Sequence, residues 1–242
     1  MEGRAFQTAL GRVPVWGDFG RFAPERRLLL VIRGAFAKSQ QLYGLAERFP
    51  DTDVAFVHLP GMFSPFFSNP SVKGFAAAFD EVLAVFGRRH VVVLGLSLGG
   101  TVALAMRSPD VKTLLLVDSL LDTQPLWMLP QLCRPRMDEH PELERWSFDL
   151  LGVSRTEVVR RDYRPLLADL SVRTGVLVGS ELPGAPRPIE QTPSLVSEDD
   201  RALYRAHPLV TLRVVPGTGH NIPRDATGAI VGAVQAVIAL PD

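Results

Sequence analysis

A serine between two glycines is the first feature of this chain whose residue types and spacing indicate chemistry. Ser97 stands in the stretch GLSLG, residues 95–99, directly after the apolar run of residues 91–94. In a G-x-S-x-G pattern the serine occupies a strained turn between a strand and a helix, and the flanking glycines let the two elements pass closely. The pattern therefore predicts a nucleophile at Ser97, with a purely structural turn as the alternative.

A serine nucleophile needs a base, and His220 is the best placed of the five histidines. A serine hydroxyl is a weak nucleophile near neutral pH unless a neighbouring group takes its proton. His220 ends the glycine-rich stretch PGTGH, residues 216–220, just after the last predicted strand. The other four histidines lie beside predicted strands or in an irregular middle segment. We therefore expect His220 to be the general base.

The elements that must position these residues alternate between short apolar runs and longer amphipathic segments. Strands are predicted at residues 25–34, 53–61, 89–97, 111–119, 173–180 and 210–217, after a strand pair in the first ~24 residues. Helices are predicted at residues 40–49, 71–86, 99–107 and 226–239. This rhythm favours an α/β fold, a mostly parallel central sheet flanked by helices on both faces.

One segment interrupts the alternation. Residues 120–170 mix prolines, charges and aromatic side chains, and the segment is too long for a simple connection between strands. Ser154 and Glu157 form an S-x-x-E capping box, which predicts a short helix. We expect residues 1–242 to form one domain, with residues 120–170 as a small helical cap inserted before the strand that bears the catalytic acid.

The motifs together resemble the α/β-hydrolase superfamily along nearly the full chain. The stretch GLSLGG (95–100) is similar to its nucleophile elbow and PGTGH (216–220) to its histidine loop. LLLVIRGAF (28–36) resembles the strand leading to the oxyanion loop, and VHLPGMFS (57–64) resembles a neighbouring loop. The sequence departs from the pattern at Arg33, where the family usually has histidine, at His58, where aspartate is common, and at Met62, which replaces a glycine.

The resemblance implies a serine, acid, histidine triad in that order along the chain. The acid usually follows the strand before the histidine strand, and Glu181 stands at that position. Asp118 ends an earlier strand and is the alternative acid, because some members of the superfamily use that site. We favour Glu181 and keep Asp118 open.

The resemblance also implies an oxyanion hole. Its donors would be the backbone N–H groups of Leu98, after the nucleophile, and of Ala35, with Phe36 as the neighbouring possibility. Arg33 is a candidate contact for a substrate carboxylate, which arginine can bind through two hydrogen bonds. The alternative for Arg33 is an ion pair with a nearby acid.

Aromatic and long apolar side chains are candidates for an acyl pocket. Phe63, Phe66 and Phe67 cluster in a proline-bounded loop, and Trp127 and Met128 lie in the expected cap. Aromatic residues more often belong to the core, so each of these also has a structural interpretation. We take Phe36, Phe63, Trp127 and Met128 as candidate substrate contacts.

Composition excludes several classes of function. The formal net charge is +0 and the pI is about 7.0, which argues against binding to nucleic acid or an anionic membrane. Cys133 is the single cysteine, so the sequence has no disulfide and no cysteine-rich metal site. No apolar run approaches the roughly 20 residues of a membrane-spanning helix, and no signal peptide is visible. We expect a cytoplasmic protein without metal or cofactor.

These features predict a serine hydrolase that cleaves a carboxylic ester, thioester or lactone through an acyl-enzyme on Ser97. Its partner would be a small acyl substrate, either free or carried on a carrier protein. An acyl-carrier thioesterase or acyltransferase would use the same triad. A member of the superfamily that binds a ligand without hydrolysing it is the alternative from another functional class.

Overall fold

A single eight-stranded sheet organises the chain. The computed structural model describes residues 1–36, 42–62, 64–87, 90–184 and 188–239. The strands are β1 (Glu2–Thr8), β2 (Gly11–Gly17), β3 (Arg27–Ile32), β4 (Thr52–Val57), β5 (Val91–Leu96), β6 (Val111–Val117), β7 (Arg173–Gly179) and β8 (Val210–Val215). Each of the strands predicted from apolar runs is present, and so is the strand pair at the N-terminal edge.

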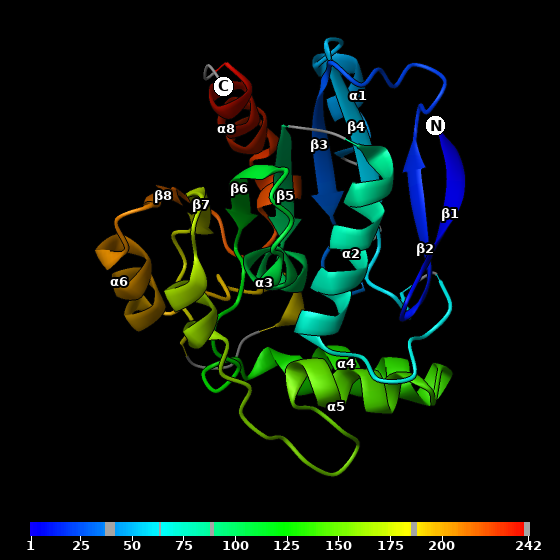
Figure 1. The fold of residues 1–242 in the computed structure, drawn as a ribbon. Helices are drawn as coiled ribbons and strands as arrows, with labels where there is room; N and C mark the ends of the chain where they lie inside the picture. Colours follow the sequence, from blue (N-terminus) through cyan, green and yellow to red (C-terminus); the bar gives the residue numbers. More distant parts are fainter. Residues whose placement is uncertain (37–41, 63, 88–89, 185–187, 240–242) are drawn as a thin grey trace.

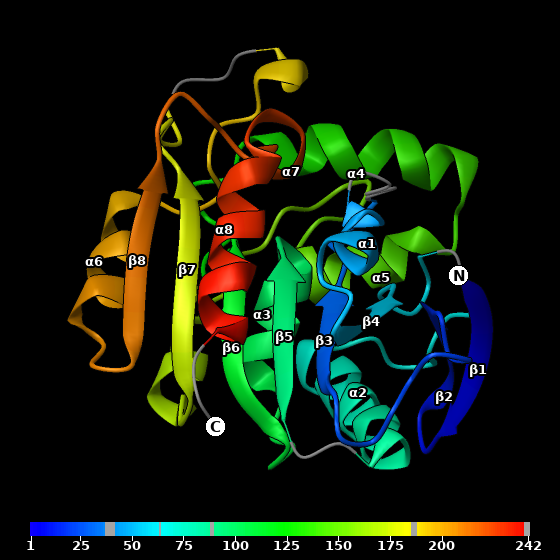
Figure 2. The ribbon, with the colours of Figure 1, turned by 90° about the horizontal axis from the view of Figure 1, so that it is seen from above.

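The sheet is mostly parallel, with the order β1-β2-β4-β3-β5-β6-β7-β8. Figure 2 shows this order from β8 at one edge to β1 at the other. The pairs from β4 to β8 are parallel, and β1 and β2 join antiparallel. Strands β3 and β5 are buried nearly throughout because helices cover both faces, which explains their continuous apolar runs.

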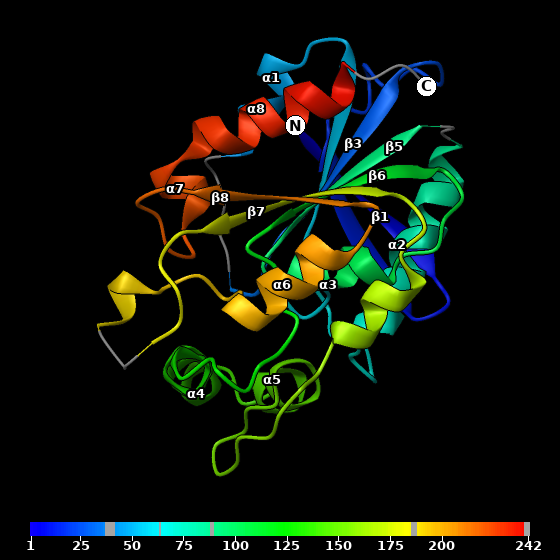
Figure 3. The same cartoon turned by 90° about the vertical axis from the view of Figure 1, so that its left-hand side faces the viewer.

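Two hydrophobic clusters fill the faces of the sheet. The first packs α2 (Val72–Phe86) and α3 (Leu98–Ala105) against the sheet, and the second packs α1 (Leu45–Arg48) and α8 (Thr227–Ile238) against the opposite face. Figure 3 shows these pairs of helices on the two sides of the strands. Ser71 caps α2 by accepting a hydrogen bond from the Gly74 amide at 3.0 Å.

Several helical segments differ from the sequence prediction. The helix expected over residues 40–49 is formed at Leu45–Arg48, and residues 40 and 41 lie outside the described residues. Helix α6 (Glu198–Ala206), between β7 and β8, was not predicted. It is capped by Ser197, whose hydroxyl accepts a hydrogen bond from the Asp200 amide, and it buries Tyr204 completely.

The segment between β6 and β7 carries α4 (Met128–Glu139), α5 (Leu143–Leu151) and the 3-10 turn η2 (Arg164–Asp169). We call residues 120–170 the cap segment. Figure 1 shows α4 and α5 lying across the end of the sheet toward which the arrowhead of β3 points, the carboxyl end of the parallel strands. The cap segment therefore lies at the edge where catalytic side chains of a parallel sheet emerge.

The helix predicted from the capping box at Ser154 is absent. The Ser154 hydroxyl does accept a hydrogen bond from the Glu157 amide, at 2.9 Å. The chain then reverses in a tight turn instead of continuing as a helix, because Val153 and Val158 pair as a β-bridge. The predicted cap interaction forms, but β-branched residues directly after it favour the extended conformation. In the described ranges, no helix is long and apolar enough to cross a membrane.

Candidate active site

Ser97 lies at a strained turn between β5 and α3. Its backbone has φ 53° and ψ −127°, a conformation that residues with a side chain rarely adopt. The Ser97 amide donates to the carbonyl oxygen of Val117 on β6 at 2.9 Å, and the Gly100 amide donates to the Ser97 carbonyl oxygen at 3.0 Å. These bonds to the sheet and the helix hold the strained residue in place. The turn therefore presents the hydroxyl at the carboxyl end of β5.

The glycines around Ser97 are required by close backbone contacts. A Cβ atom on Gly95 would lie 2.4 Å from the Gly100 Cα atom, and one on Gly99 would lie 2.5 Å from the Ile32 carbonyl oxygen. Gly34 passes directly beside the serine, since a Cβ there would lie 2.9 Å from the Ser97 Cβ atom. The motif thus brings the helix, strand β5 and the loop after β3 together at one point.

His220 pairs with Asp118. The Nδ1 atom of His220 lies 2.8 Å from the Oδ2 atom of Asp118. Asp118 is the residue after β6 and is completely buried, whereas the side chain of His220 is 23% exposed. The glycines of the histidine loop allow it to pack closely, because a Cβ on Gly219 would lie 2.2 Å from the Thr192 carbonyl oxygen. The loop therefore holds the imidazole against the carboxylate with one edge open to solvent.

Asp118 is held by further donors that the sequence did not reveal. The Ser194 hydroxyl donates to Oδ1 at 2.5 Å, and the Leu195 amide donates to Oδ2 at 2.7 Å. The Gly179 amide at the end of β7 donates to Oδ1 at 3.2 Å. Asp118 has φ 46°, an unusual value that an aspartate tolerates better than most residues. Both carboxylate oxygens are thus satisfied, and the side chain is fixed toward His220.

Our preference for Glu181 as the partner of the histidine is corrected by this geometry. Glu181 follows β7 as expected, but it is an exposed residue. Its backbone amide donates to the Thr218 carbonyl oxygen in the histidine loop. The carboxylate that meets His220 belongs to the neighbouring strand β6. The reason is local. The turn at Asp118 directs its carboxylate toward His220, and donors from residues 179, 194 and 195 hold the carboxylate there.

The two amides expected to form an oxyanion hole belong to Leu98, directly after the serine, and to Ala35, directly after Gly34, which approaches Ser97. Leu98 is the first residue of α3, where a helix leaves its N–H groups without an intrahelical partner. Within the part of the chain that the structure describes, neither the Leu98 amide nor the Ala35 amide donates a hydrogen bond. Phe36, the next residue in that loop, has φ 60°. Both N–H groups therefore stay candidates for the oxyanion hole.

Arg33 does not extend toward the site as a free substrate contact. It is 2% exposed, and its guanidinium lies over the Tyr43 ring at 4.5 Å and the Phe56 ring at 5.9 Å. One of its nitrogens lies 3.3 Å from Nε2 of His58. Burial, followed by the charge of Arg33, lowers the pKa of His58 to about 4. Two of the three departures from the family pattern, Arg33 and His58, thus contact each other.

Comparisons with known proteins identify the family of the chain. Residues 16–233 match the model of the alpha/beta hydrolase family. The chain belongs to the alpha/beta hydrolase family. No curated protein matches the chain. As in other members of the family, the sheet is mixed but mostly parallel, with helices on both faces.

Solved structures of other family members are similar over nearly the whole chain. An esterase from Exiguobacterium antarcticum is 15% identical with a TM-score of 0.71, covering 99% of this chain and 100% of its own. An N-acyl homoserine lactonase in complex with N-butanoyl homoserine is 17% identical with a TM-score of 0.68, covering 100% and 99%. The thioesterase domain from the curacin biosynthetic pathway is 18% identical with a TM-score of 0.63, covering 97% and 99%. At these identities the similarity shows a shared fold.

The candidate pocket residues of this alpha/beta hydrolase divide into several environments. Met128 is completely buried, and Phe67 packs on Phe75 in the core with ring centroids 5.6 Å apart. Trp127 is half-buried, and its indole N–H has no hydrogen-bond partner among the described residues. Phe66 is 38% exposed, and Phe63 lies outside the described residues. Of this group, Trp127 keeps the features of a ligand contact.

Two residues near the oxyanion loop were missed by sequence reasoning. The ring of Phe36 lies 5.8 Å from the ring of Trp146, a buried residue of α5 whose indole donates to the Pro60 carbonyl oxygen at 2.7 Å. The guanidinium of Arg136, on α4, lies 4.6 Å from the centre of the Phe36 ring on its face. No sequence signal identifies these contacts, because they depend on how the cap segment folds back over the sheet.

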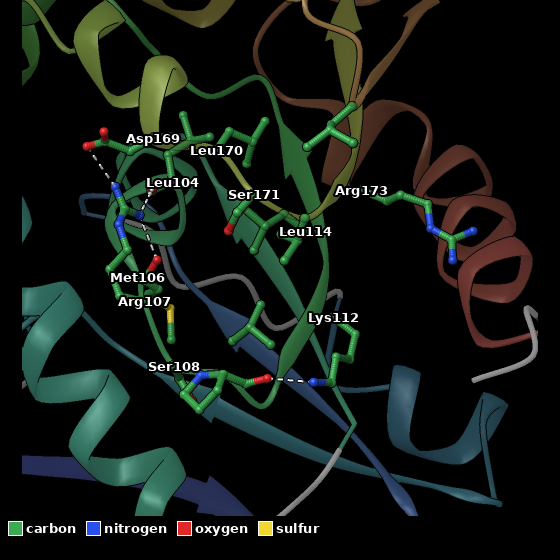
Figure 4. Close-up of a pocket in the computed structure, with 14 residues that line it drawn as sticks. Leu104, Met106, Arg107, Ser108, Lys112, Leu114, Asp169, Leu170, Ser171 and Arg173 are labelled. Atoms are coloured by element: carbon green, nitrogen blue, oxygen red, sulfur yellow. Dashed lines mark hydrogen bonds and ion pairs between the residues drawn. The ribbon is translucent and has the colours of Figure 1, made fainter.

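A separate surface pocket of about 500 Å³ lies at the opposite end of the sheet. It is lined by the first residues of β6 and β7, whereas Ser97 lies at the carboxyl end of β5. Two of its cations are engaged, since Arg107 pairs with Asp169 and Lys112 donates to the Pro109 carbonyl oxygen. Figure 4 shows Arg173 pointing away from the other labelled residues. This pocket is distinct from the candidate active site.

Other reactive groups lie apart from the candidate site or are inert. In the described ranges, no group of three or more His, Cys, Asp or Glu side chains could hold a metal ion. Cys133 is buried in α4, and burial raises the pKa of its thiol to about 11. A thiol with such a pKa is protonated near neutral pH and is a poor nucleophile.

Proposed function

We propose that this protein is a serine hydrolase that cleaves a carboxylic ester, thioester or lactone through an acyl-enzyme on Ser97. The observation that carries the proposal is the pairing of His220 with the buried Asp118 at the edge of the sheet where the strained Ser97 turn ends β5. A buried carboxylate fixed by several donors, an imidazole with one exposed edge and a serine on a strained turn form the combination that activates a hydroxyl.

Asp118 would set the tautomer of the histidine. A hydrogen bond from Nδ1–H of His220 to Oδ2 of Asp118 leaves Nε2 unprotonated and able to accept a proton. The carboxylate also stabilises the imidazolium that forms when the proton is taken. Its complete burial makes this interaction stronger than it would be in water.

The reaction would proceed in two steps. In the first, Nε2 of His220 takes the Ser97 proton while Oγ bonds to the carbonyl carbon, and the Leu98 and Ala35 amides hold the oxyanion. The bond to the leaving alcohol or thiol then breaks, and His220 gives the proton to that group. In the second step a water gives a proton to His220 and attacks the acyl carbon. The bond between the acyl carbon and Oγ then breaks, His220 gives the proton to Oγ of Ser97, and the acid leaves. For a lactone, the leaving hydroxyl stays attached to the acyl group.

The decisive experiment is covalent labelling with a fluorophosphonate probe, which reacts with activated serines. The wild-type protein should be labelled, mass spectrometry should place the adduct on Ser97, and the Ser97→Ala variant should not react. The Ser108→Ala variant, in the pocket at the opposite end of the sheet, is the matched control and should label like the wild type. A folded wild-type protein that resists the probe would contradict the proposal and favour ligand binding without hydrolysis.

A substrate panel then separates the possible bonds. Matched p-nitrophenyl esters, acyl-thioesters and lactones of the same acyl chain would be compared by kcat/KM. Turnover of free esters above carrier-bound thioesters favours an esterase, and the reverse favours a carrier-directed thioesterase or acyltransferase. Loss of all three activities in the Ser97→Ala variant assigns them to one nucleophile.

A further inference from the structure

Arg136 lies on the side of α4 that faces the sheet. Leu129, Cys133 and Met137 form the buried row of this helix, and Arg136 occupies the adjacent row, one turn after Leu132. The residue is half-buried rather than exposed. Its position on the helix therefore directs a long cationic side chain along the surface between the cap segment and the loop that carries Ala35.

The guanidinium ends on the loop that carries one candidate oxyanion donor. It lies over the Phe36 ring, 4.6 Å from the ring centre. Phe36 directly follows Ala35, whose amide is a candidate oxyanion donor, and Gly34 in the same loop approaches Ser97. A positive charge is thus placed one residue along the chain from the proposed oxyanion hole, on the side covered by the cap segment.

This charge has no carboxylate partner among the described residues. The guanidinium of Arg136 donates to the Leu132 carbonyl oxygen at 2.6 Å and packs on Phe36. Among the other arginines of the cap segment, some form ion pairs: Arg155 with Glu144, Arg160 with Asp122 and Arg164 with Asp200. Arg134 and Arg161 instead donate to main-chain carbonyl oxygens within the segment. Arg136 differs from these two because its guanidinium stacks on a residue of the loop that carries Ala35.

The remaining N–H groups of Arg136 suit an anion. A guanidinium carries more donors than one carbonyl oxygen can accept, and its planar fork fits a carboxylate through paired hydrogen bonds. Stacking on the Phe36 ring fixes the plane of the fork and lowers the entropy lost on binding. Partial burial strengthens the attraction relative to a fully exposed pair.

We propose that Arg136 binds a carboxylate of the substrate, so that the enzyme prefers esters, thioesters or lactones that carry a free carboxylate near the scissile carbonyl. This inference rests on the proposed function, since it names the substrate class of the same site. Arg136 would then be a specificity residue of the cap segment, and Phe36 would align it. The chemistry of the bond cleavage is left to Ser97 and His220.

The first test compares matched ester pairs in the wild type and in Arg136→Met. The p-nitrophenyl monoester of glutaric acid is compared with that of valeric acid, and 4-acetoxybenzoate with phenyl acetate, so that the carboxylate lies on the acyl or on the leaving side. In the pair whose carboxylate lies on the side that residue 136 reaches, kcat/KM of the variant for the anionic ester should fall about tenfold or more, mainly because KM rises. The neutral esters should change by less than about twofold.

Two further variants separate binding from packing. Arg136→Lys keeps the charge but not the fork, and it should recover part of the activity toward the anionic ester. Arg145→Met removes an exposed cation of the same cap segment and should leave both members of each pair unchanged. If Arg136→Met lowers anionic and neutral esters equally, or lowers neither, the carboxylate role is wrong.

A binding measurement makes the inference independent of catalysis. The p-nitrophenyl monoester of glutaric acid is titrated into the Ser97→Ala variant and into the Ser97→Ala, Arg136→Met double variant by calorimetry. The single variant should bind at least about tenfold more tightly. Equal affinities would overturn the inference even if Ser97 is labelled, whereas a failure of labelling with the affinity difference intact would overturn the serine mechanism alone.

Discussion

The imidazole of His220 and the carboxylate of Asp118 meet at 2.8 Å although 102 positions separate them in the chain. The sheet creates this contact, because Asp118 directly follows β6 and the histidine loop follows β8, with β7 between them. The Asp118 amide donates to the Leu177 carbonyl oxygen on β7 at 2.7 Å, and the Gly179 amide donates back to the carboxylate. Strand β7 thus aligns the acid with the histidine.

Replacing Asp118 by asparagine should lower kcat/KM by a factor of about 10³–10⁴, because an amide no longer holds the imidazole in the active tautomer. Steady-state hydrolysis of a p-nitrophenyl ester measures the loss. Glu181→Gln is the matched control and should stay within about twofold of the wild type, since that residue is exposed. A larger loss in Glu181→Gln than in Asp118→Asn would restore Glu181 as the acid.

Ser194→Ala should reduce kcat/KM about tenfold while the protein stays folded. The Ser194 hydroxyl donates to Asp118 at 2.5 Å and is completely buried, so its loss frees one carboxylate oxygen to turn away from His220. Activity and urea unfolding should be measured on the same preparation. Unchanged activity would show that the Leu195 and Gly179 amides are sufficient to orient the acid.

Gly95→Ala should destabilise the fold by about 3 kcal/mol or more. The new methyl group would lie 2.4 Å from the Gly100 Cα atom, and both residues are fixed by the sheet and by α3. Gly232→Ala provides the contrast: it lies in α8, where a Cβ meets nothing within 4 Å, so alanine should stabilise by about 0.5–1 kcal/mol. Urea denaturation curves measure both, and similar effects at the two sites would contradict the packing argument.

Protein stability should fall between pH 6.5 and pH 4 because of His58. Burial, together with the nearby Arg33, lowers its pKa from 6.5 to about 4. Between these two pH values the unfolded state binds a proton at His58 that the folded state does not bind. The contribution of His58 to the free energy of unfolding is therefore complete above pH 6.5 and is lost as the pH falls toward 4. The full loss is about 3 kcal/mol.

Urea unfolding of the wild type and of His58→Asn at pH 7.5 and pH 5 tests this expectation. The variant should show a smaller difference between the two pH values than the wild type. His140→Asn, at an exposed histidine of the cap segment, should keep the difference of the wild type. An equal pH dependence in the wild type and His58→Asn would contradict the assignment.

Much of the fold and part of the candidate site could be read from local sequence. The apolar runs predicted the strands because a parallel strand covered on both faces needs continuous burial. The neighbourhoods of Ser97 and His220 were visible because each depends on glycines within a few residues. Helix α6 was missed because it is short and mostly polar, apart from residues such as Tyr204 that it buries.

The acid and the cap contacts could not be chosen from local sequence. Glu181 and Asp118 both follow a predicted strand, and the difference between them is the turn at Asp118 together with donors from residues 179, 194 and 195. Arg136 meets Phe36 only after the chain has passed through β4, β5 and β6 and returned as α4. Contacts of this range depend on the whole fold.

Asp118 lies two positions before the cap segment, yet the contacts of its carboxylate described above all come from residues beyond that segment. Ser97 is likewise fixed by β6 and α3. An exchange of residues in α4 and α5 would therefore leave Ser97, His220 and Asp118 in register. With the proposed function, the protein is a scaffold in which substrate choice can be altered, by evolution or by an engineer, without moving these three residues.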